Sequence, residues 1–181
     1  MCSRARIAIA FVVGLAGLAA GAGARVFLST DEALRLAFPG CAVAKQTTFL
    51  TAAQLQRARE LAGVEVPSAL VVAYAATCNG APAGTAYFDA HIVRTLPETL
   101  LIVVDPQGKV ARVEVLSFEE PEDYLPRGPW YAQFVGRGLD PELELDRAIR
   151  RVSGASLTAR STTQAVRRVL AIDRVRREAE P

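Results

Sequence analysis

The chain has 181 residues, of which 51% are hydrophobic, and its formal net charge is +2. This length suffices for one domain with its own core and is too short for two, so we expect a single domain. Basic residues number 21 and acidic residues 19, a balance that excludes the basic excess typical of nucleic-acid-binding proteins. We therefore expect no nucleic-acid partner.

Residues 1–24 have the order of features found in a secretory signal peptide. A basic start is followed by an apolar run over residues 7–21 and then by small residues. We expect cleavage after Ala24, so that the mature protein starts at Arg25. An uncleaved membrane anchor is the alternative, because a helix needs about 20 apolar residues to cross a bilayer and this run approaches that length. In both cases we expect the rest of the chain to be periplasmic or otherwise extracytoplasmic, since the positive charges before the run stay inside.

Two cysteines remain in the exported part, Cys41 and Cys78. In an oxidising compartment they can form a disulfide, which would stabilise the fold by about 4 kcal/mol through the loop that it closes. Two separate buried thiols are the alternative. Both interpretations stay open, because a sequence does not show whether two Cβ atoms meet.

Two capping boxes mark the starts of short helices near the N-terminus. In a capping box, a Ser or Thr side chain and a Glu or Gln side chain three residues later each accept a hydrogen bond from an unpaired backbone N–H group. The boxes are Ser29 with Glu32, which predicts a helix over residues 30–38, and Thr51 with Gln54, which predicts a helix over residues 51–62 with Gly63 as its C-terminal cap.

The middle of the chain predicts two antiparallel hairpins. Their strands are residues 68–77 with 84–93, around the turn Asn79-Gly80, and residues 99–104 with 109–118, around the turn Asp105-Pro106-Gln107-Gly108. In the last strand, alternation predicts one face in the core and one in solvent. Short helices before the hairpins and a helix after them give an α+β fold class, with the C-terminal helix packed on the sheet.

Aromatic and arginine-rich segments complete the chain. Residues 119–138 predict an ordered loop whose Trp130, Tyr131 and Phe134 pack over one end of the sheet. Residues 158–177 predict the C-terminal helix, with apolar residues at helical spacing on one side and arginines on the other.

The segment Ser153-Gly154-Ala155-Ser156-Leu157-Thr158 lies at the start of that helix. A helix start offers unpaired backbone N–H groups and the positive end of the helix dipole, which together favour a phosphate group. The glycine lets the backbone approach a ligand closely, and the hydroxyls supply one acceptor for a covalent group and hydrogen-bond partners for it. The alternative is that the segment is an N-terminal cap and nothing more.

This segment resembles the Ser/Thr-Gly-Ala-Thr/Ser-x-Thr motif of the FMN-binding domain family, whose members include the flavin-carrying small subunits of the Rnf complex and of sodium-translocating NADH:quinone reductase. The resemblance extends over residues 84–173. It includes a hydrophobic strand, an Asp-Pro-Gln-Gly-Lys turn, a second strand, Gln133-Phe134-Val135-Gly136, the motif and a helix with Val166-Arg167-Arg168-Val169, in similar order and spacing. The resemblance implies that residues 25–181 form one FMN-binding-type domain.

In that family a separate Mg²⁺-dependent flavin transferase uses FAD to attach FMN to the hydroxyl at the fourth motif position, which is Ser156 here. The resemblance therefore implies covalent FMN on Ser156 through a phosphoester, contacts from the other motif residues, and an electron carrier without turnover of its own. The implied partners are the flavin transferase and an unidentified membrane or periplasmic redox partner. The chain departs from the family in carrying serine instead of the commoner threonine at this position, and Arg150 where an acid is usual.

A second cluster lies in the strand that contains Asp89 and His91. These residues are two apart, so a strand points both to one face, and His91 is the only histidine in the chain. We expect His91 and Arg94 to bind the cofactor, with Arg94 beside the flavin phosphate or the electron-rich edge of the ring. A surface His–Asp pair and a solvated arginine are the alternative. One histidine with one carboxylate provides too few ligands for a metal ion, so no metal site is predicted.

Two other functions stay open. One is a binding or assembly module of the same fold without flavin, which is favoured if Arg150 prevents modification, and flavin absorbance separates it from a carrier. The other is a small flavin-dependent reductase, which steady-state turnover with a reduced donor would reveal.

Overall fold

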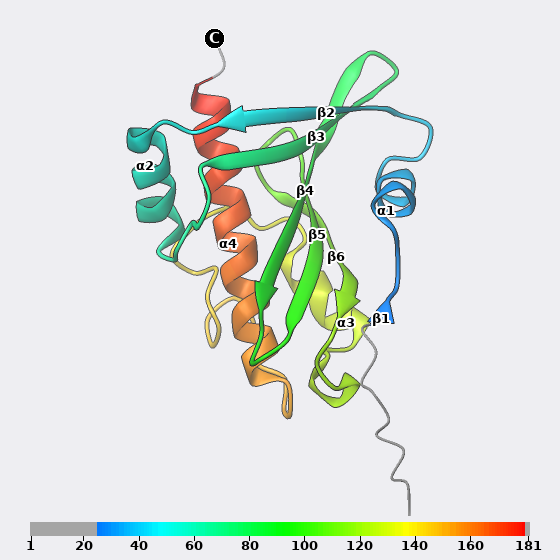
Figure 1. Ribbon diagram of the computed structural model, residues 1–181, viewed down its shortest axis with the longest axis vertical. Coiled ribbons are helices and arrows are strands. Elements are labelled where there is room, and N and C mark those ends of the chain that lie inside the picture. Colours follow the sequence, from blue (N-terminus) through cyan, green and yellow to red (C-terminus); the bar gives the residue numbers. More distant parts are fainter. Residues whose placement is uncertain (1–24, 180–181) are drawn as a thin grey trace, which may run out of the picture.

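The computed structural model describes residues 25–179, so the predicted signal segment lies outside the described residues. Six strands and several helices follow one another along the chain (Figure 1). They are β1 (Arg25–Val26), α1 (Thr30–Ala37), β2 (Ala42–Phe49), α2 (Ala52–Ala62), β3 (Leu70–Cys78), β4 (Ala81–Ile92), β5 (Pro97–Val104), β6 (Val110–Phe118), the 3₁₀ helix η1 (Glu122–Tyr124), α3 (Gly128–Tyr131), the 3₁₀ helix η2 (Ala132–Phe134) and α4 (Ser156–Glu178). Within this range no helix has both the length and the hydropathy that a bilayer crossing requires.

The strands form one antiparallel sheet in the order β1-β6-β5-β4-β3-β2. The pairs β3–β4 and β5–β6 are the two predicted hairpins, and β4 also pairs with β5, which joins the hairpins into a continuous meander. The short helices α1 and α2 come before the hairpins, and α4 comes last. The predicted α+β class, with a C-terminal helix packed on the sheet, is confirmed.

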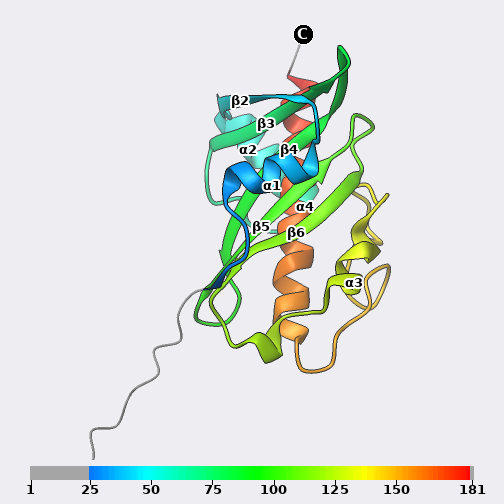
Figure 2. The same ribbon diagram turned by 90° about the vertical axis from the view of Figure 1, so that its right-hand side faces the viewer.

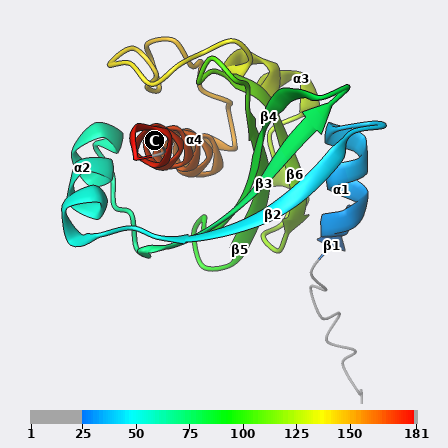
Figure 3. The same cartoon turned by 90° about the horizontal axis from the view of Figure 1, so that it is seen from above.

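Helices cover both faces of the sheet, and Figure 3 shows α2 and α4 on one face and α1 on the other. The main core lies under α2 and α4, where Leu100, Ile102 and Val166 are fully buried. A smaller core lies under α1, where Leu34 and Phe38 pack against Leu101 and other residues of the sheet. The sheet is therefore the middle layer, and each face buries the side chains that point toward it.

The predicted helix ends agree with the structure. Both capping boxes are present, since Ser29 and Thr51 accept hydrogen bonds from the backbone of Glu32 and Gln54, whose side chains accept in return. Gly63 ends α2 with φ of 65°, a left-handed conformation that glycine adopts without a Cβ penalty. Local sequence signals alone were sufficient to place these helices.

Two features of the strands differ from the prediction. Strand β2 was not predicted; it is an edge strand with mostly exposed residues, so it lacks the apolar pattern that identifies a strand. In β6 the simple alternation fails, because the pairing register shifts between Val103 and Val104 of β5. This irregularity places both Val110 and Val113 in the main core, although they are three residues apart.

The arginines of α4 do not all face solvent, and the prediction was wrong for Arg167 and Arg176, which are 8% and 6% exposed. The Arg167 guanidinium donates hydrogen bonds to three backbone carbonyls, those of Ala62, Asp140 and Leu143. The sheet, α2 and the loop before α4 all pack against α4, so little of the surface of this helix faces solvent.

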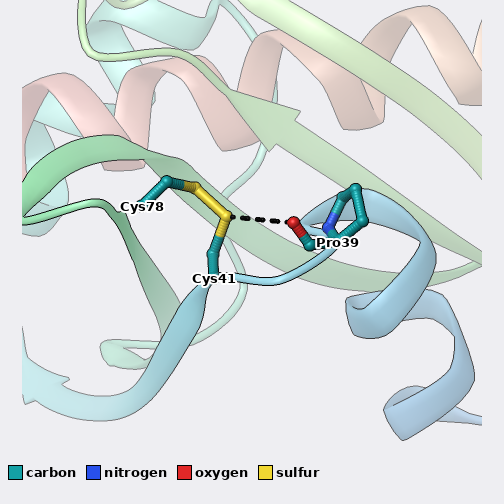
Figure 4. Close-up of a disulfide and its surroundings, with 3 residues drawn as sticks. All are labelled: Pro39, Cys41 and Cys78. Atoms are coloured by element: carbon teal, nitrogen blue, oxygen red, sulfur yellow. Dashed lines mark hydrogen bonds between the residues drawn. A yellow bond between two sulfur atoms is a disulfide. The ribbon is translucent and has the colours of Figure 1, made fainter.

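Cys41 and Cys78 form a disulfide between the start of β2 and the end of β3 (Figure 4). Their Cα atoms are 4.5 Å apart, next to the paired residues Ala42 and Thr77 of the two strands. Cys41 Sγ also lies 3.6 Å from the carbonyl oxygen of Pro39. Of the two interpretations of the cysteines, the disulfide is confirmed, and it ties the edge strand to the sheet.

Candidate functional site

A cavity of about 190 Å³ lies at the start of α4, and we call it the Ser156 pocket. Figures 1 and 2 both place this start of α4 at the same end of the molecule as η1 and the turn between β4 and β5. The pocket is lined by Gly154, Ala155, Ser156, Leu157 and Thr158 from the predicted segment, by Arg94 from the turn and by Tyr124 from η1. The fold thus brings Arg94 beside the segment, although the two are far apart in sequence.

No side chain caps the N-terminus of α4. The N-cap residue is Ala155, which cannot accept a hydrogen bond through its side chain, and Ser156 is the first residue of the helix. The alternative in which a serine of the segment caps the helix is therefore wrong. The amides of the first turn and the positive end of the helix dipole are left at the pocket, where they favour an anion.

The three hydroxyls of the segment have different surroundings. Ser156 is exposed, and its hydroxyl donates only a long hydrogen bond of 3.3 Å to the Val152 carbonyl. Thr158 is 1% exposed, and its hydroxyl donates to the Tyr124 carbonyl at 2.6 Å. Ser153 is exposed but does not line the pocket. Ser156 therefore has the accessible hydroxyl of the pocket, while the Thr158 hydroxyl holds η1 against α4.

Gly154 has a backbone conformation that favours glycine, although there is room for a side chain at this position. Its φ is 84°, in the left-handed region, whereas a Cβ there would meet no atom closer than Asp123 O at 3.9 Å. This turn directs the chain from the preceding loop into α4 and leaves the Ser156 hydroxyl on the surface.

Arg94 is held by contacts on its own turn and with η1. Its guanidinium carbon lies 4.5 Å from the centroid of the Tyr124 ring, a cation–π contact. Glu120 Oε1 accepts hydrogen bonds from the amides of Thr95 and Leu96, at 2.7 and 2.9 Å, and these bonds hold the pKa of Glu120 below its usual value. The turn that carries Arg94 is thereby anchored, and the charge stays at the pocket.

Arg150, which stands where the motif that the segment resembles usually has an acid, is exposed, but its backbone is fixed. Its amide donates to Gln133 Oε1 at 2.9 Å, and its carbonyl accepts a 2.6 Å hydrogen bond from the indole of Trp130. The nearest upstream acid, Asp146, pairs with Arg151 and not with Arg150.

His91 lies in a separate place from the Ser156 pocket, in a group of charged side chains that we call the His91 network. His91 Nδ1 is 2.9 Å from Asp89 Oδ1, and Nε2 is 3.1 Å from Glu98 Oε2. Arg168 of α4 donates two hydrogen bonds of 2.8 Å to the Asp89 carboxylate. The His91 side chain is 12% exposed, so the His–Asp pair is not the surface pair of the alternative interpretation.

The charges of the His91 network hold each other in their ionised forms. Burial alone would lower the pKa of His91, but its hydrogen bonds to Asp89 and Glu98 and their negative charges raise it to about 9. Burial works to raise the pKa of Asp89, but hydrogen bonds from His91 and Arg168 outweigh it and leave that pKa below its usual value. Both ring nitrogens of His91 are occupied by carboxylates, so the ring has no nitrogen left for a ligand.

His91, Asp89 and Arg168 are among the residues that line a second cleft, of about 600 Å³, between β3, β4, α4 and the loop before β3. Arg94 does not line this cleft. Of the two residues predicted beside the flavin, the structure therefore brings only Arg94 to the segment.

Several site residues were missed in the sequence. Tyr124 has no signal beyond being an aromatic residue in a proline-containing loop, and Glu120 belonged to an acidic run that is ordinarily solvated. Glu98 pairs across the β4–β5 hairpin with His91, so correct strand pairing would have found it. Glu98 is a second carboxylate beside His91, in addition to Asp89. Even so, no group of three or more His, Cys, Asp or Glu in residues 25–179 is arranged to hold a metal ion.

A scan against protein-family models, a search of curated proteins and a search of solved structures each return no match for this chain.

Proposed function

We propose that this protein is an exported electron carrier with FMN attached covalently to Ser156 through a phosphoester. The observation that carries the proposal is the uncapped start of α4, where an exposed serine lines the same small pocket as Arg94. FMN supplies the one- and two-electron chemistry when bound, and the protein supplies attachment, position and electrostatics.

Attachment requires a nucleophile that a modifying enzyme can reach. In the proposed reaction with FAD, the Ser156 oxygen forms a bond to the phosphorus on the FMN side, the pyrophosphate P–O bond breaks, and AMP leaves while the hydroxyl proton passes to solvent or to the transferase. The exposure of Ser156 and its single long hydrogen bond to Val152 support this role, because little has to be broken to free the hydroxyl.

The groups around Ser156 are suited to a phosphodiester, which keeps one negative charge. The first-turn amides and the dipole of α4 stabilise such a charge at a helix start. Arg94 adds a full positive charge from the facing turn, and Tyr124 holds that guanidinium in place. Thr158 keeps η1 and Tyr124 against the helix.

The size of the Ser156 pocket limits what it encloses. Cavities that bury a whole cofactor-sized ligand measure about 300–1,000 Å³, whereas this pocket measures about 190 Å³. The pocket therefore suits the phosphate and the adjoining part of the ribityl chain, and the flavin ring would lie outside it. Leu157, 50% exposed at the rim, offers an apolar surface there.

The Cys41–Cys78 disulfide supports the exported part of the proposal, because disulfides persist in oxidising compartments such as the periplasm. A flavin transferase in the same compartment would be the modifying partner, and the redox partner would be periplasmic or membrane-bound.

The test is flavin loading on co-expression with a flavin transferase, with export and Mg²⁺. Wild-type protein should be yellow and should keep its colour after denaturation, because a phosphoester survives unfolding. Ser156→Ala should be colourless, whereas Ser156→Thr should keep the colour, since the hydroxyl remains. Ser153→Ala is the matched control, because it removes a neighbouring exposed hydroxyl that does not line the pocket.

Two further variants locate the determinants of loading. Arg94→Gln should lower the fraction of protein that carries flavin, since it removes the charge facing the phosphate. Arg150→Asp should raise that fraction if Arg150 weakens recognition by the transferase. Wild-type protein that stays colourless with a competent transferase would contradict the proposal and favour a binding or assembly module without flavin.

A further inference from the structure

Strands β3 and β4 pair along only part of their length. Their register runs from Cys78 with Ala81 at the hairpin turn to Ala73 with Tyr87. Beyond this point, within residues 25–179, β3 pairs with β2 alone and β4 with β5 alone. Figure 1 shows the two strands running apart from there. A sheet that opens in this way has two inner edges, whose backbone groups face a gap instead of a neighbouring strand.

The inner edge of β3 finds a partner in its own chain. A continued register would place Leu70 opposite Ala90, but β3 and β4 no longer pair at these residues. Instead the Leu70 amide donates a 3.0 Å hydrogen bond to Ser68 Oγ, and the Ser68 hydroxyl donates a 3.2 Å hydrogen bond to the Leu70 carbonyl. Leu70 is therefore satisfied without β4.

The inner edge of β4 stays open among the described residues. Ile92 lies opposite Pro97, which has no N–H group and whose carbonyl accepts a hydrogen bond from the Glu119 amide, on the side away from β4. The two residues are therefore a non-hydrogen-bonded pair. Such pairs recur at every second residue of an antiparallel ladder, so the amides and carbonyls of Ile92 and Ala90 point away from β5 and into the gap.

The second cleft lies in this gap, and we call it the β3–β4 cleft. Its volume of about 600 Å³ is in the range of cavities that take a ligand, and Val169 and Ile172 of α4 are among its lining residues. Leu70, 45% exposed, and Ile92, 58% exposed, also line it. Phe49, 73% exposed, pairs with Leu70 and so lies on the same face of the sheet. Exposed apolar side chains that gather in this way mark an interaction site.

We propose that the β3–β4 cleft binds an extended segment of a partner protein, which adds to β4 as a strand. The backbone groups of Ala90 and Ile92 recur at about 7 Å, the repeat that an extended chain matches with its own amides and carbonyls. Apolar side chains at alternate positions of the segment pack on Leu70 and Ile92. A small apolar ligand would displace water from the same backbone groups without replacing its hydrogen bonds, which is costly.

The charges of the β3–β4 cleft favour a basic residue in the segment. The positive charges of His91 and Arg168 are balanced by the carboxylates of Asp89 and Glu98. Glu65 also lines the cleft and is exposed, and no described residue forms an ion pair with it. Its negative charge is therefore available to a partner.

The β3–β4 cleft is separate from the Ser156 pocket. Arg168, which lines the cleft, lies about 18 Å further along α4 than Ser156, at about 1.5 Å per residue. A strand in the cleft leaves the pocket open, so this binding does not depend on flavin attachment.

Synthetic peptides and the full-length protein test the proposal. The probes are fluorescein-labelled peptides of about eight residues, with valine, leucine or phenylalanine at alternate positions and threonine or arginine between them. Fluorescence polarisation should give a dissociation constant below about 1 mM for at least one of them. That peptide should also slow hydrogen exchange at the amides of Ala90 and Ile92. Failure of every peptide to bind, or binding without this protection, overturns the proposal.

Two variants separate backbone pairing from apolar contact. Ala90→Pro removes the amide that faces the cleft and no hydrogen bond to β5, so binding should weaken about three- to tenfold while the fold stays intact. Ile92→Asp should weaken binding at least about tenfold. The matched control is Leu36→Asp, at a residue of α1 that is 56% exposed and outside the cleft, and it should bind as wild type does.

Each of these variants can contradict the proposal. Unchanged binding in Ile92→Asp, or an equal loss in Leu36→Asp, would place the peptide elsewhere. Unchanged binding in Ala90→Pro would mean that the cleft takes apolar groups without strand addition. Glu65→Gln should weaken the arginine-containing peptides about two- to threefold and leave the peptides without arginine unchanged, and equal effects on both would overturn the role of its charge.

Discussion

His91 and Arg94, which lie close together in sequence at the β4–β5 turn, have different surroundings. His91 lies at the end of β4 with its ring nitrogens occupied by the carboxylates of Asp89 and Glu98, whereas Arg94, in the turn itself, is exposed and lines the Ser156 pocket. The two residues are three positions apart. The His91 ring makes its hydrogen bonds within the protein, whereas the charge of Arg94 is available to a ligand. The difference indicates that the His91 network serves stability, and it agrees with the ligand-binding role that we propose for the Ser156 pocket.

The largest expected effect separates the two regions by their contribution to stability. Glu98→Ala leaves the His91 imidazolium without one of its two carboxylates in a buried site, so the free energy of unfolding should fall by about 3–5 kcal/mol. Ser156→Ala changes an exposed hydroxyl and should stay within about 0.5 kcal/mol of wild type. Urea denaturation of both variants makes the comparison, and similar losses in the two would remove the distinction.

The pH dependence of stability tests the contribution of the His91 network separately from that of the Ser156 pocket. The folded pKa of His91, about 9, exceeds its unfolded value of about 6.5, so its interactions stabilise the protein fully below pH 6.5. This stabilisation, up to about 3 kcal/mol, should be lost as the pH rises through about 9. At acid pH the effect of Asp89 is the opposite. Its folded pKa is below its unfolded pKa, so the stability that it contributes is lost as the pH falls through the folded pKa. Chemical denaturation of wild type and His91→Gln from pH 6 to 10 should show the alkaline loss only in wild type.

The smallest expected effect is at the Ser156 pocket. Gly154→Ala places a Cβ on a residue with φ of 84°, which should cost about 1 kcal/mol of stability and lower flavin loading by shifting the approach to Ser156. Gly128→Ala is the matched control, because Gly128 has an ordinary φ and open space around it. Equal loading in both variants would show that the conformation at Gly154 does not matter for attachment.

Local signals in the sequence predicted much of the fold. The capping boxes at Ser29 and Thr51 depend on residues three positions apart, so the chain needs no tertiary information to form them. Strand β2 was missed for the opposite reason, since its exposed residues become a strand only through pairing with β3. The burial of Arg167 follows likewise from carbonyl partners in α2 and in the loop before α4.

The candidate site was predictable only where its residues are contiguous. The segment from Gly154 to Thr158 could be located from its composition and resemblance, but its contacts with Arg94 and Tyr124 join three separate stretches of chain. His91 was singled out as the only histidine, yet its role depends on Glu98 across a hairpin and on Arg168 from α4. Such contacts become visible only once the pairing of the strands and the packing of α4 on the sheet are known.

The central claim is the covalent attachment at Ser156, and intact mass tests it most directly. Protein that is co-expressed with a flavin transferase and exported should carry the added mass of one FMN less one water, and peptide mapping should place that mass on the peptide containing Ser156. Ser156→Ala, prepared in the same way, should show the unmodified mass. Wild-type protein at the unmodified mass, or an adduct that persists in Ser156→Ala, would contradict the account.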